Sequence, residues 1–149
     1  MRYSENEIER FLVKIDETFP THISEKVNLH EYAKKLSEKA TLCCIDDGNE
    51  ICSMVAGYTE NTIGNIAYIS LVATRPELQR RSYATKLLKE FMDICRIKGL
   101  NGIHLYTDIK NTGANKLYQK LGYKQWFMKD EPRKKDIHYI YRISENRIV

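Results

Sequence analysis

The chain has 149 residues, of which 42% are hydrophobic and 30% charged, with 7 Gly and 3 Pro, a composition that excludes collagen-like, low-complexity and wholly disordered proteins. The length is typical of one domain, so we expect a single globular domain over residues 1–149. The net charge of +4 is unevenly divided, because residues 1–74 hold 7 basic and 12 acidic side chains whereas residues 75–149 hold 17 and 8, so an anionic ligand is expected on the second half.

Two amphipathic helices are predicted before any strand. The first begins with a capping box, Ser4 followed three residues later by Glu7, and is expected to end near Phe19 because Pro20 follows. A second helix can be capped by Asn28 and runs to about residue 40.

The strands and later helices follow from turn signals and apolar runs. The Asp47-Gly48 step predicts a hairpin, because both residues tolerate a positive φ. The run from Ile66 to Ala73 is almost entirely apolar or β-branched, which predicts a central strand covered on both faces. Further strands are predicted over 41–45, 51–58, 103–109, 124–128 and 137–143, with helices over 83–98 and 111–121. The order ααβββαβαββ indicates a mixed α/β (α+β) domain.

The sequence indicates neither a membrane nor an oxidising compartment. No apolar run approaches the roughly 20 residues of a membrane span, and the first ten residues are acidic where a signal peptide would be basic and then apolar. We therefore expect a cytoplasmic protein without a membrane partner. The four cysteines are Cys43, Cys44, Cys52 and Cys95. They form no CxxC pair and lie in apolar runs, which predicts free buried thiols and no metal site.

The segment from Ser70 to Leu88 places a buried strand, a short basic turn and a helix start in succession. Backbone N–H groups of a first helical turn lack intrahelical partners and lie at the positive end of the helix dipole, so they favour a pyrophosphate. Arg80 and Arg81 add positive charge, and Ser82 and Thr85 add hydroxyl donors. An ordinary helix start with two solvated arginines would show the same pattern.

A later segment, Asn111 to Tyr123, resembles the second cofactor motif of the GNAT acetyltransferase superfamily, in which an Asn opens a short helix, an Ala lies three residues on, and Leu-Tyr is followed by Leu-Gly-aromatic. The stretch from Gln79 to Ala84 resembles the pyrophosphate signature of that family, Gln/Arg-x-x-Gly-x-Gly/Ala, at the expected distance upstream. Ser82 stands at the first Gly position. A helical Ser is tolerated there and can donate its own hydrogen bond, so we expect binding to survive.

The resemblance implies a central mixed, mostly antiparallel sheet flanked by helices, and acetyl-CoA as co-substrate without a metal. The backbone around Val72 to Thr74 would pair with the pantetheine arm where the central strand bulges and splays from its neighbour, and Asn111 would bind the same arm. N–H groups of the pyrophosphate signature would hold the pyrophosphate. The cofactor contacts implied in this way are Val72, Ala73, Thr74, Gln79, Arg80, Arg81, Ser82, Tyr83, Ala84, Thr85, Asn111 and Tyr118.

By the same resemblance, the reaction is direct attack of a primary amine on the thioester, which needs a proton for the departing thiolate and a base for the ammonium. Tyr118 is the expected general acid, although its position also suits a core aromatic residue. Glu60 is the expected base, directly or through water. Strand alternation predicts that only one face of the strand over 103–109 looks into the site. Other candidates are Tyr68, Ser70, His104, Tyr106, Asp108, His22 and His30.

The acceptor and the partners follow from charge and from the resemblance. Carboxylates of the acid-rich first half favour a cationic amine, which could belong to an aminoglycoside, a polyamine, an amino acid or a protein. A chain of 149 residues leaves little surface for protein recognition, so a small molecule is the expected acceptor. A homodimer through the last strands is expected, since Tyr139 and Tyr141 alternate there and one face would be free to pack. Two alternatives stay open: a non-catalytic domain that binds acyl-CoA or a partner, and a nucleic-acid binder. The basic run over 133–135 is balanced by neighbouring acids, which disfavours the latter.

Overall fold

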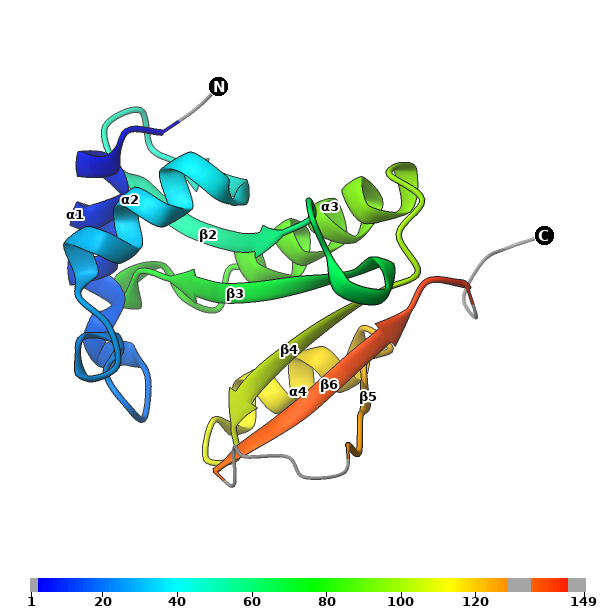
Figure 1. The fold of residues 1–149 in the computed structure, drawn as a ribbon. Helices are drawn as coiled ribbons and strands as arrows, with labels where there is room; N and C mark the ends of the chain where they lie inside the picture. Colours follow the sequence, from blue (N-terminus) through cyan, green and yellow to red (C-terminus); the bar gives the residue numbers. More distant parts are fainter. Residues whose placement is uncertain (1–2, 129–134, 145–149) are drawn as a thin grey trace.

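A twisted sheet with helices on both faces forms the centre of the computed structural model, which describes residues 3–128 and 135–144 (Figure 1). The described residues form six strands in the order β1-β2-β3-β4-β6-β5, in which β3 and β4 are parallel and the other neighbours antiparallel. The strands are β1 (Thr41–Asp46), β2 (Ile51–Tyr58), β3 (Ile66–Thr74), β4 (Gly102–Asp108), β5 (Lys124–Gln125) and β6 (Asp136–Arg142), and the helices are α1 (Glu5–Ile15), α2 (Leu29–Lys39), α3 (Tyr83–Ile97) and α4 (Thr112–Lys120). The predicted mixed α/β fold is confirmed.

The N-terminal helices form as their caps predict, with one difference in length. Ser4 and Glu7 make both bonds of the capping box, and the Asn28 side chain accepts from the N–H of Glu31. The prediction that the first helix reaches residue 19 is wrong, because α1 ends at Ile15 and a 3-10 turn follows. Asp16 begins this 3-10 turn, and its carboxylate accepts hydrogen bonds from the backbone N–H and the hydroxyl of Ser24 in the following segment.

Each face of the sheet has its own apolar core. One core joins α1 and α2 to β2 and β3, and the other joins α3 and α4 to all the strands from β1 to β4 and to β6. The four cysteines are free thiols, as predicted, and three of them are buried. Within residues 3–128 and 135–144, no helix combines the length and the apolar character that crossing a bilayer requires.

A β-bulge at Ser70 interrupts β3. In the register with β2, Ala56 pairs with Leu71 and Gly57 with Ile69, so Ser70 has no opposite residue. Because one extra residue reverses the alternation of side chains, Ile69 faces the α3 core whereas Leu71 faces the α1–α2 core. Pairing between β3 and β4 also ends at Ile69, and beyond it the two strands diverge (Figure 1).

The C-terminal part differs most from the sequence expectation. The strand predicted over 124–128 is wrong in length, because β5 covers Lys124–Gln125 alone. Trp126 makes one more backbone bond to β6, through His138, and Phe127 is 81% exposed, so the chain leaves the sheet there. The basic run over 133–135 and the acids that balance it lie mostly outside the described residues. The other boundaries agree with the prediction within two residues.

Gly57 lies beside the bulge and has no room for a side chain. A Cβ there would lie 2.5 Å from Cζ of Phe91 and 2.7 Å from the carbonyl oxygen of Tyr68. We expect Gly57→Ala to lower the free energy of unfolding by about 2–3 kcal/mol, since the backbone oxygen cannot move aside cheaply. Chemical denaturation measures this loss.

The matched control is Gly113→Ala in α4, where a Cβ meets nothing within 4 Å. We expect a small gain in stability there, up to about 1 kcal/mol, because alanine is the better helix former. Equal losses for both variants would contradict the packing argument.

Candidate active site

A cleft of about 800 Å³ lies where β3 and β4 diverge. Its lining comes from α2 and the segment before it on one side of the sheet, from β3 and β4 in the middle, and from α4 on the other side. The cleft therefore connects the two faces of the sheet through the gap that the bulge and the end of pairing leave.

Both faces of β4 contribute to this lining. Tyr106 and Asp108 face the side of α2, whereas Leu105 and Thr107 face the side of α4, and all four line the cleft. The expectation that a single face of this strand looks into the site is therefore wrong. The cleft passes between strands and not over one face of the sheet, so side chains from both faces of β4 reach it.

The edge of β3 next to the cleft is available for an extended ligand. Val72, Ala73 and Thr74 pair with β2 on one side. On the other side, no described residue of β4 pairs with β3 beyond Ile69. Backbone groups at such an edge can bind an extended polar chain as an added strand would. The bulge and the splay implied by the resemblance are thus both present.

Asn111 lies at the cleft as the N-cap of α4. Its Oδ1 accepts from the N–H of Ala114 at 3.3 Å, and its backbone oxygen accepts from Nδ2 of Asn115 at 2.8 Å. Within the described residues its own Nδ2 donates to nothing, and Asn111 lines the cleft. This amide is therefore a donor available to a ligand.

The loop from Gln79 to Ser82 is exposed and leads into α3 outside the lining of the cleft. Arg80 and Ser82 adopt left-handed conformations, with φ of 66° and 64°. The expectation of a helical Ser82 is wrong: it is the N-cap of α3, and its side chain makes no capping bond. The turn into α3 needs a positive φ, which glycine adopts without cost. N–H groups of the first turn, which includes Tyr83, Ala84 and Thr85, have no helical acceptor.

Tyr118 lies on α4, lines the cleft and is 5% exposed. The rings of Tyr123 and Tyr139 each lie 5.8 Å from its ring. Burial, with a smaller contribution from the Tyr139 charge, raises the pKa of Tyr118 well above its usual range. The phenol therefore keeps its proton at neutral pH, so it is suited to act as a proton donor and not as a base.

A buried polar network holds α4 in place, and sequence reasoning missed it. Asn115, which is 8% exposed, accepts from the hydroxyl of Tyr139 at 2.7 Å and donates to the backbone oxygens of Asp108 and Asn111. Gln119 donates to the same Tyr139 hydroxyl. The network links α4 to β4 and β6, so it positions Tyr118. An Asn inside an apolar helix stripe was the available signal.

The structure does not bring Glu60 to the cleft. Its side chain is 71% exposed after β2 and pairs with Lys98 at the end of α3. The role of Glu60 as base stays a prediction. Among the other candidates, Tyr68, Ser70, Tyr106 and Asp108 line the cleft, whereas His22, His30 and His104 do not.

The α2 side of the cleft is rich in tyrosine. The Tyr32 hydroxyl lies 2.5 Å from Oγ of Ser70, and the rings of Tyr58 and Tyr68 stack at 6.4 Å. The Tyr58 hydroxyl is buried and has no hydrogen-bond partner among the described residues. Nζ of Lys35 lies 5.1 Å from the centre of the Tyr58 ring.

Charged residues of the lining come from both halves of the chain. The lining includes three carboxylates, of Glu31, Asp108 and Asp136, and two lysines, Lys26 and Lys35. Only the first of these carboxylates belongs to the acid-rich half, so the charge division of the chain contributes less to the cleft than expected. Asp108 and Asp136 lie directly opposite each other in the register of β4 and β6.

Residues 7–123, which are most of the chain, match the Acetyltransferase (GNAT) family. The chain belongs to the GNAT family. The resemblance seen in the sequence is thus confirmed. The catalytic subunit NAA20 of the N-terminal acetyltransferase B complex from Arabidopsis thaliana is 28% identical over 127 residues, which are 82% of this chain and 70% of that protein.

Two further acetyltransferases match over shorter segments. Chloroplastic GCN5-related N-acetyltransferase 4 of Arabidopsis thaliana is 36% identical over 59 residues, and mycothiol acetyltransferase of Renibacterium salmoninarum is 36% identical over 61. These matches cover 40% and 41% of this chain and only 20% and 18% of those proteins.

Solved GNAT structures share the fold. The PaiA N-acetyltransferase of Thermoplasma acidophilum in complex with coenzyme A aligns with a TM-score of 0.70 at 14% identity, over 95% of this chain and 96% of that one. A GNAT acetyltransferase of Staphylococcus aureus aligns with a TM-score of 0.74 at 15% identity, over 96% and 97%.

The left-handed Ser82 predicts a stabilising substitution. The left-handed conformation costs a non-glycine residue roughly 1–2 kcal/mol, and Ser82→Gly removes this cost. Glycine also gives the unfolded chain more conformational entropy, which lowers stability by about 0.5–1 kcal/mol. We expect the free energy of unfolding to rise by about 0.5–1 kcal/mol in chemical denaturation. Lys89→Gly, at an exposed helical position of α3, serves as the control and is expected to lose about 1 kcal/mol. A loss of stability in Ser82→Gly would contradict the strain argument.

Proposed function

We propose that this chain transfers the acetyl group of acetyl-CoA to a primary amine by direct attack. The observation that carries the proposal is the cleft between β3 and β4, which joins a free strand edge and the amide of Asn111 on one side to a tyrosine-lined and acid-containing pocket on the other. Acetyl-CoA supplies the activated thioester. The residues present suit it, because they offer backbone pairing, an amide donor and unpaired N–H groups beside Arg80 and Arg81.

Tyr118 is the general acid of this proposal. It lies on the lining next to Ala114, on the α4 side of the gap, and holds its proton at neutral pH. A thiolate that forms beside it is desolvated as well, which raises the affinity of the sulfur for a proton. The phenol therefore donates its proton to the sulfur. The hydrogen bond between Asn115 and Tyr139 holds α4, and with it Tyr118, in place beside the cleft.

The acceptor of this proposal is a cationic small-molecule amine on the α2 side. Asp108 and Asp136 are register partners on adjacent strands and both line the cleft, so carboxylate charge at this end of the cleft can attract an ammonium group. Rings of Tyr58 and Tyr68 add a surface that attracts an ammonium group. Glu60 stays a proposed base that acts through water, whereas Asp108 can accept the proton directly.

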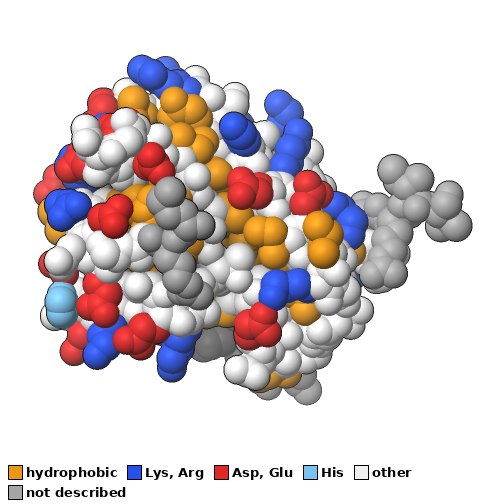
Figure 2. All heavy atoms as spheres, turned by 90° about the horizontal axis from the view of Figure 1, so that it is seen from above, with side chains coloured by type: hydrophobic (Ala, Val, Ile, Leu, Met, Phe, Trp, Pro, Cys, Tyr) orange, Lys and Arg blue, Asp and Glu red, His pale blue; other side chains and the backbone are white. Residues whose placement is uncertain are grey.

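The alternatives make different predictions about charge and assembly. Figure 2 shows acidic and basic side chains interspersed on the face that it draws, which does not support a nucleic-acid surface there. In β6, residues 138–141 are all buried within the chain, so the expected free face of this strand is absent from the described residues. A cytoplasmic homodimer stays a proposal.

Isothermal titration with acetyl-CoA, followed by a free-thiol assay over a polyamine, an aminoglycoside, an amino acid and a peptide, tests the function. We expect binding and turnover with at least one cationic small amine. Binding without turnover on any amine would favour the non-catalytic acyl-CoA domain. If acetyl-CoA does not bind and DNA or RNA binds in a salt-sensitive way, the result would favour the hypothesis of a nucleic-acid-binding protein.

Removal of the Tyr118 hydroxyl tests the acid. We expect Tyr118→Phe to lower kcat by about 10- to 1000-fold with little change in acetyl-CoA affinity, because the phenol acts in proton transfer and not in binding. Steady-state kinetics measure both values. Tyr123→Phe, on the neighbouring buried ring outside the cleft lining, is the control and should keep kcat. An unchanged kcat in Tyr118→Phe removes this residue from the mechanism.

Neutralisation of Asp108 tests the acceptor side. Asp108→Asn should raise the KM for a cationic amine about tenfold, since a carboxylate near the ammonium is lost, and leave acetyl-CoA affinity within about twofold. Asp93→Asn, an exposed carboxylate of α3 paired with Arg96, removes the same charge away from the cleft. If both variants change KM alike, the effect is one of net charge and the assignment fails.

A further inference from the structure

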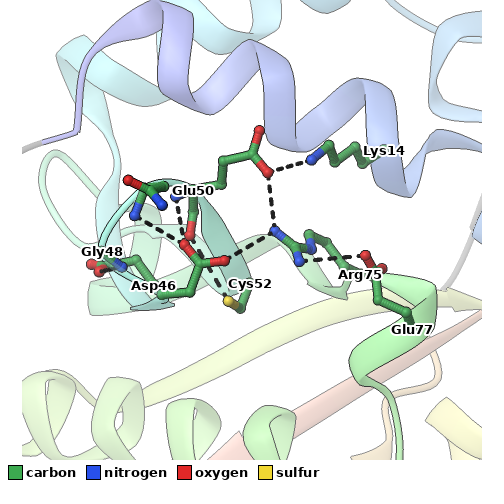
Figure 3. Close-up of polar contacts among 9 residues, drawn as sticks. Lys14, Asp46, Gly48, Glu50, Cys52, Arg75 and Glu77 are labelled. Atoms are coloured by element: carbon green, nitrogen blue, oxygen red, sulfur yellow. Dashed lines mark hydrogen bonds and ion pairs between the residues drawn. The ribbon is translucent and has the colours of Figure 1, made fainter.

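Arg75 follows β3 directly, and its side chain is 10% exposed. Figure 3 shows its guanidinium between Glu50 and Glu77. Nη1 lies 3.3 Å from the carboxylate of Glu50 and 3.7 Å from that of Asp47, and Nη2 lies 3.3 Å from that of Glu77. One planar cation therefore joins the β1–β2 turn to the short 3-10 helix over 76–78.

The backbone of Arg75 is fixed at both of its polar groups. Its N–H donates to the oxygen of Cys52 at 2.9 Å, and its oxygen accepts from the N–H of Leu78 at 2.9 Å. Lys14 of α1 pairs with Glu50 as well, so the ion pairs reach a third element (Figure 3). The point where the chain leaves the sheet is thus held by α1, the β1–β2 turn and β2 together.

The segment that follows, residues 79–82, is weakly attached at its N-terminal end. Gln79 makes two hydrogen bonds, from its N–H to the oxygen of Pro76 and from Nε2 to the oxygen of Thr74, and both are 3.5 Å long. Arg80 and Ser82 are nevertheless left-handed. Strained conformations persist only where the surrounding structure over-determines them. On that side the firm contacts nearest to this segment are those of Arg75, whereas at its other end the oxygen of Ser82 accepts the first bond of α3, from the N–H of Lys86 at 3.1 Å.

We infer that Arg75 is a positioning residue for the loop over 79–82. Its ion pairs hold the start of the loop so that the strained conformation persists and the N–H groups at the start of α3 stay presented. Residues outside the cleft, in the β1–β2 turn and α1, thereby take part in positioning this loop. This positioning role rests on the proposed use of acetyl-CoA for its kinetic readout alone, because the conformation of the loop can be measured without any ligand.

Limited trypsin digestion of the whole chain, followed by mass spectrometry, measures how often the loop opens. Arg80 and Arg81 are exposed cleavage sites within it. We expect Arg75→Gln to raise the cleavage rate at these two bonds on the order of tenfold, because the ion pairs of a mostly buried arginine with partly exposed carboxylates are lost and the loop opens more often. Arg96→Gln, which removes an exposed arginine of α3 paired with Asp93, is the control and should leave the loop rate unchanged.

A second substitution separates loop strain from general destabilisation. Glycine takes the left-handed conformation without cost, so Ser82→Gly in the Arg75→Gln background should return cleavage towards the wild-type rate. An unchanged rate in Arg75→Gln, or equal increases at tryptic sites throughout the chain, would overturn the inference. Failure of Ser82→Gly to restore protection would overturn it as well.

Kinetics supply the independent readout. Arg75→Gln should raise the KM for acetyl-CoA about tenfold with kcat within about twofold, and leave kcat/KM for S-acetylpantetheine, which lacks the pyrophosphate, unchanged. Arg75→Lys keeps the charge but lacks the planar fork of the guanidinium, so most of the increase in the KM for acetyl-CoA should remain. A wild-type KM in this variant would overturn positioning by geometry. If the wild-type chain does not bind acetyl-CoA, the proposed function fails and the trypsin assay still decides the inference.

Discussion

The cleft depends on one irregularity of the sheet, the extra residue in β3. Ser70 has no opposite residue in β2, and just before it the pairing with β4 ends. A parallel pair that continued would have closed the sheet and satisfied the backbone groups of Val72 to Thr74 internally. The unpaired edge and the passage between the two faces therefore have the same origin, and Gly57 allows it by letting Phe91 and the Tyr68 backbone approach closely.

Buried polar groups then fix the elements on either side of this opening. Asn115 and Tyr139 tie α4 to the strands, whereas Arg75 ties the loop before α3 to the β1–β2 turn. Such contacts add little net stability, but an unpaired partner in a dry site is costly, so each network favours one arrangement over its neighbours. Precision at the cleft comes from these few directional bonds, and the apolar cores supply the bulk of the stability.

Local chemistry made much of the fold predictable, and non-local contacts account for what was missed. Ser4, Asn28 and the Asp47-Gly48 step act on neighbouring residues, so their caps and turn could be recognised directly. The left-handed Ser82 depends on how the chain must enter α3, which no spacing reveals. The motif over 111–123 placed Asn111 and Tyr118 at the cleft, whereas Glu60 lies after β2 and outside the cleft lining, where it pairs with Lys98, 38 residues away.

The bulge has a thermodynamic consequence as well as a geometric one. The first half of β3 packs into the core of α3 and α4, and its second half packs into the core of α1 and α2. Neither core can lose its order without releasing part of a strand that the other core needs. The two layers are thereby made to unfold as one cooperative unit, and a ligand bound between β3 and β4 would stabilise both at once.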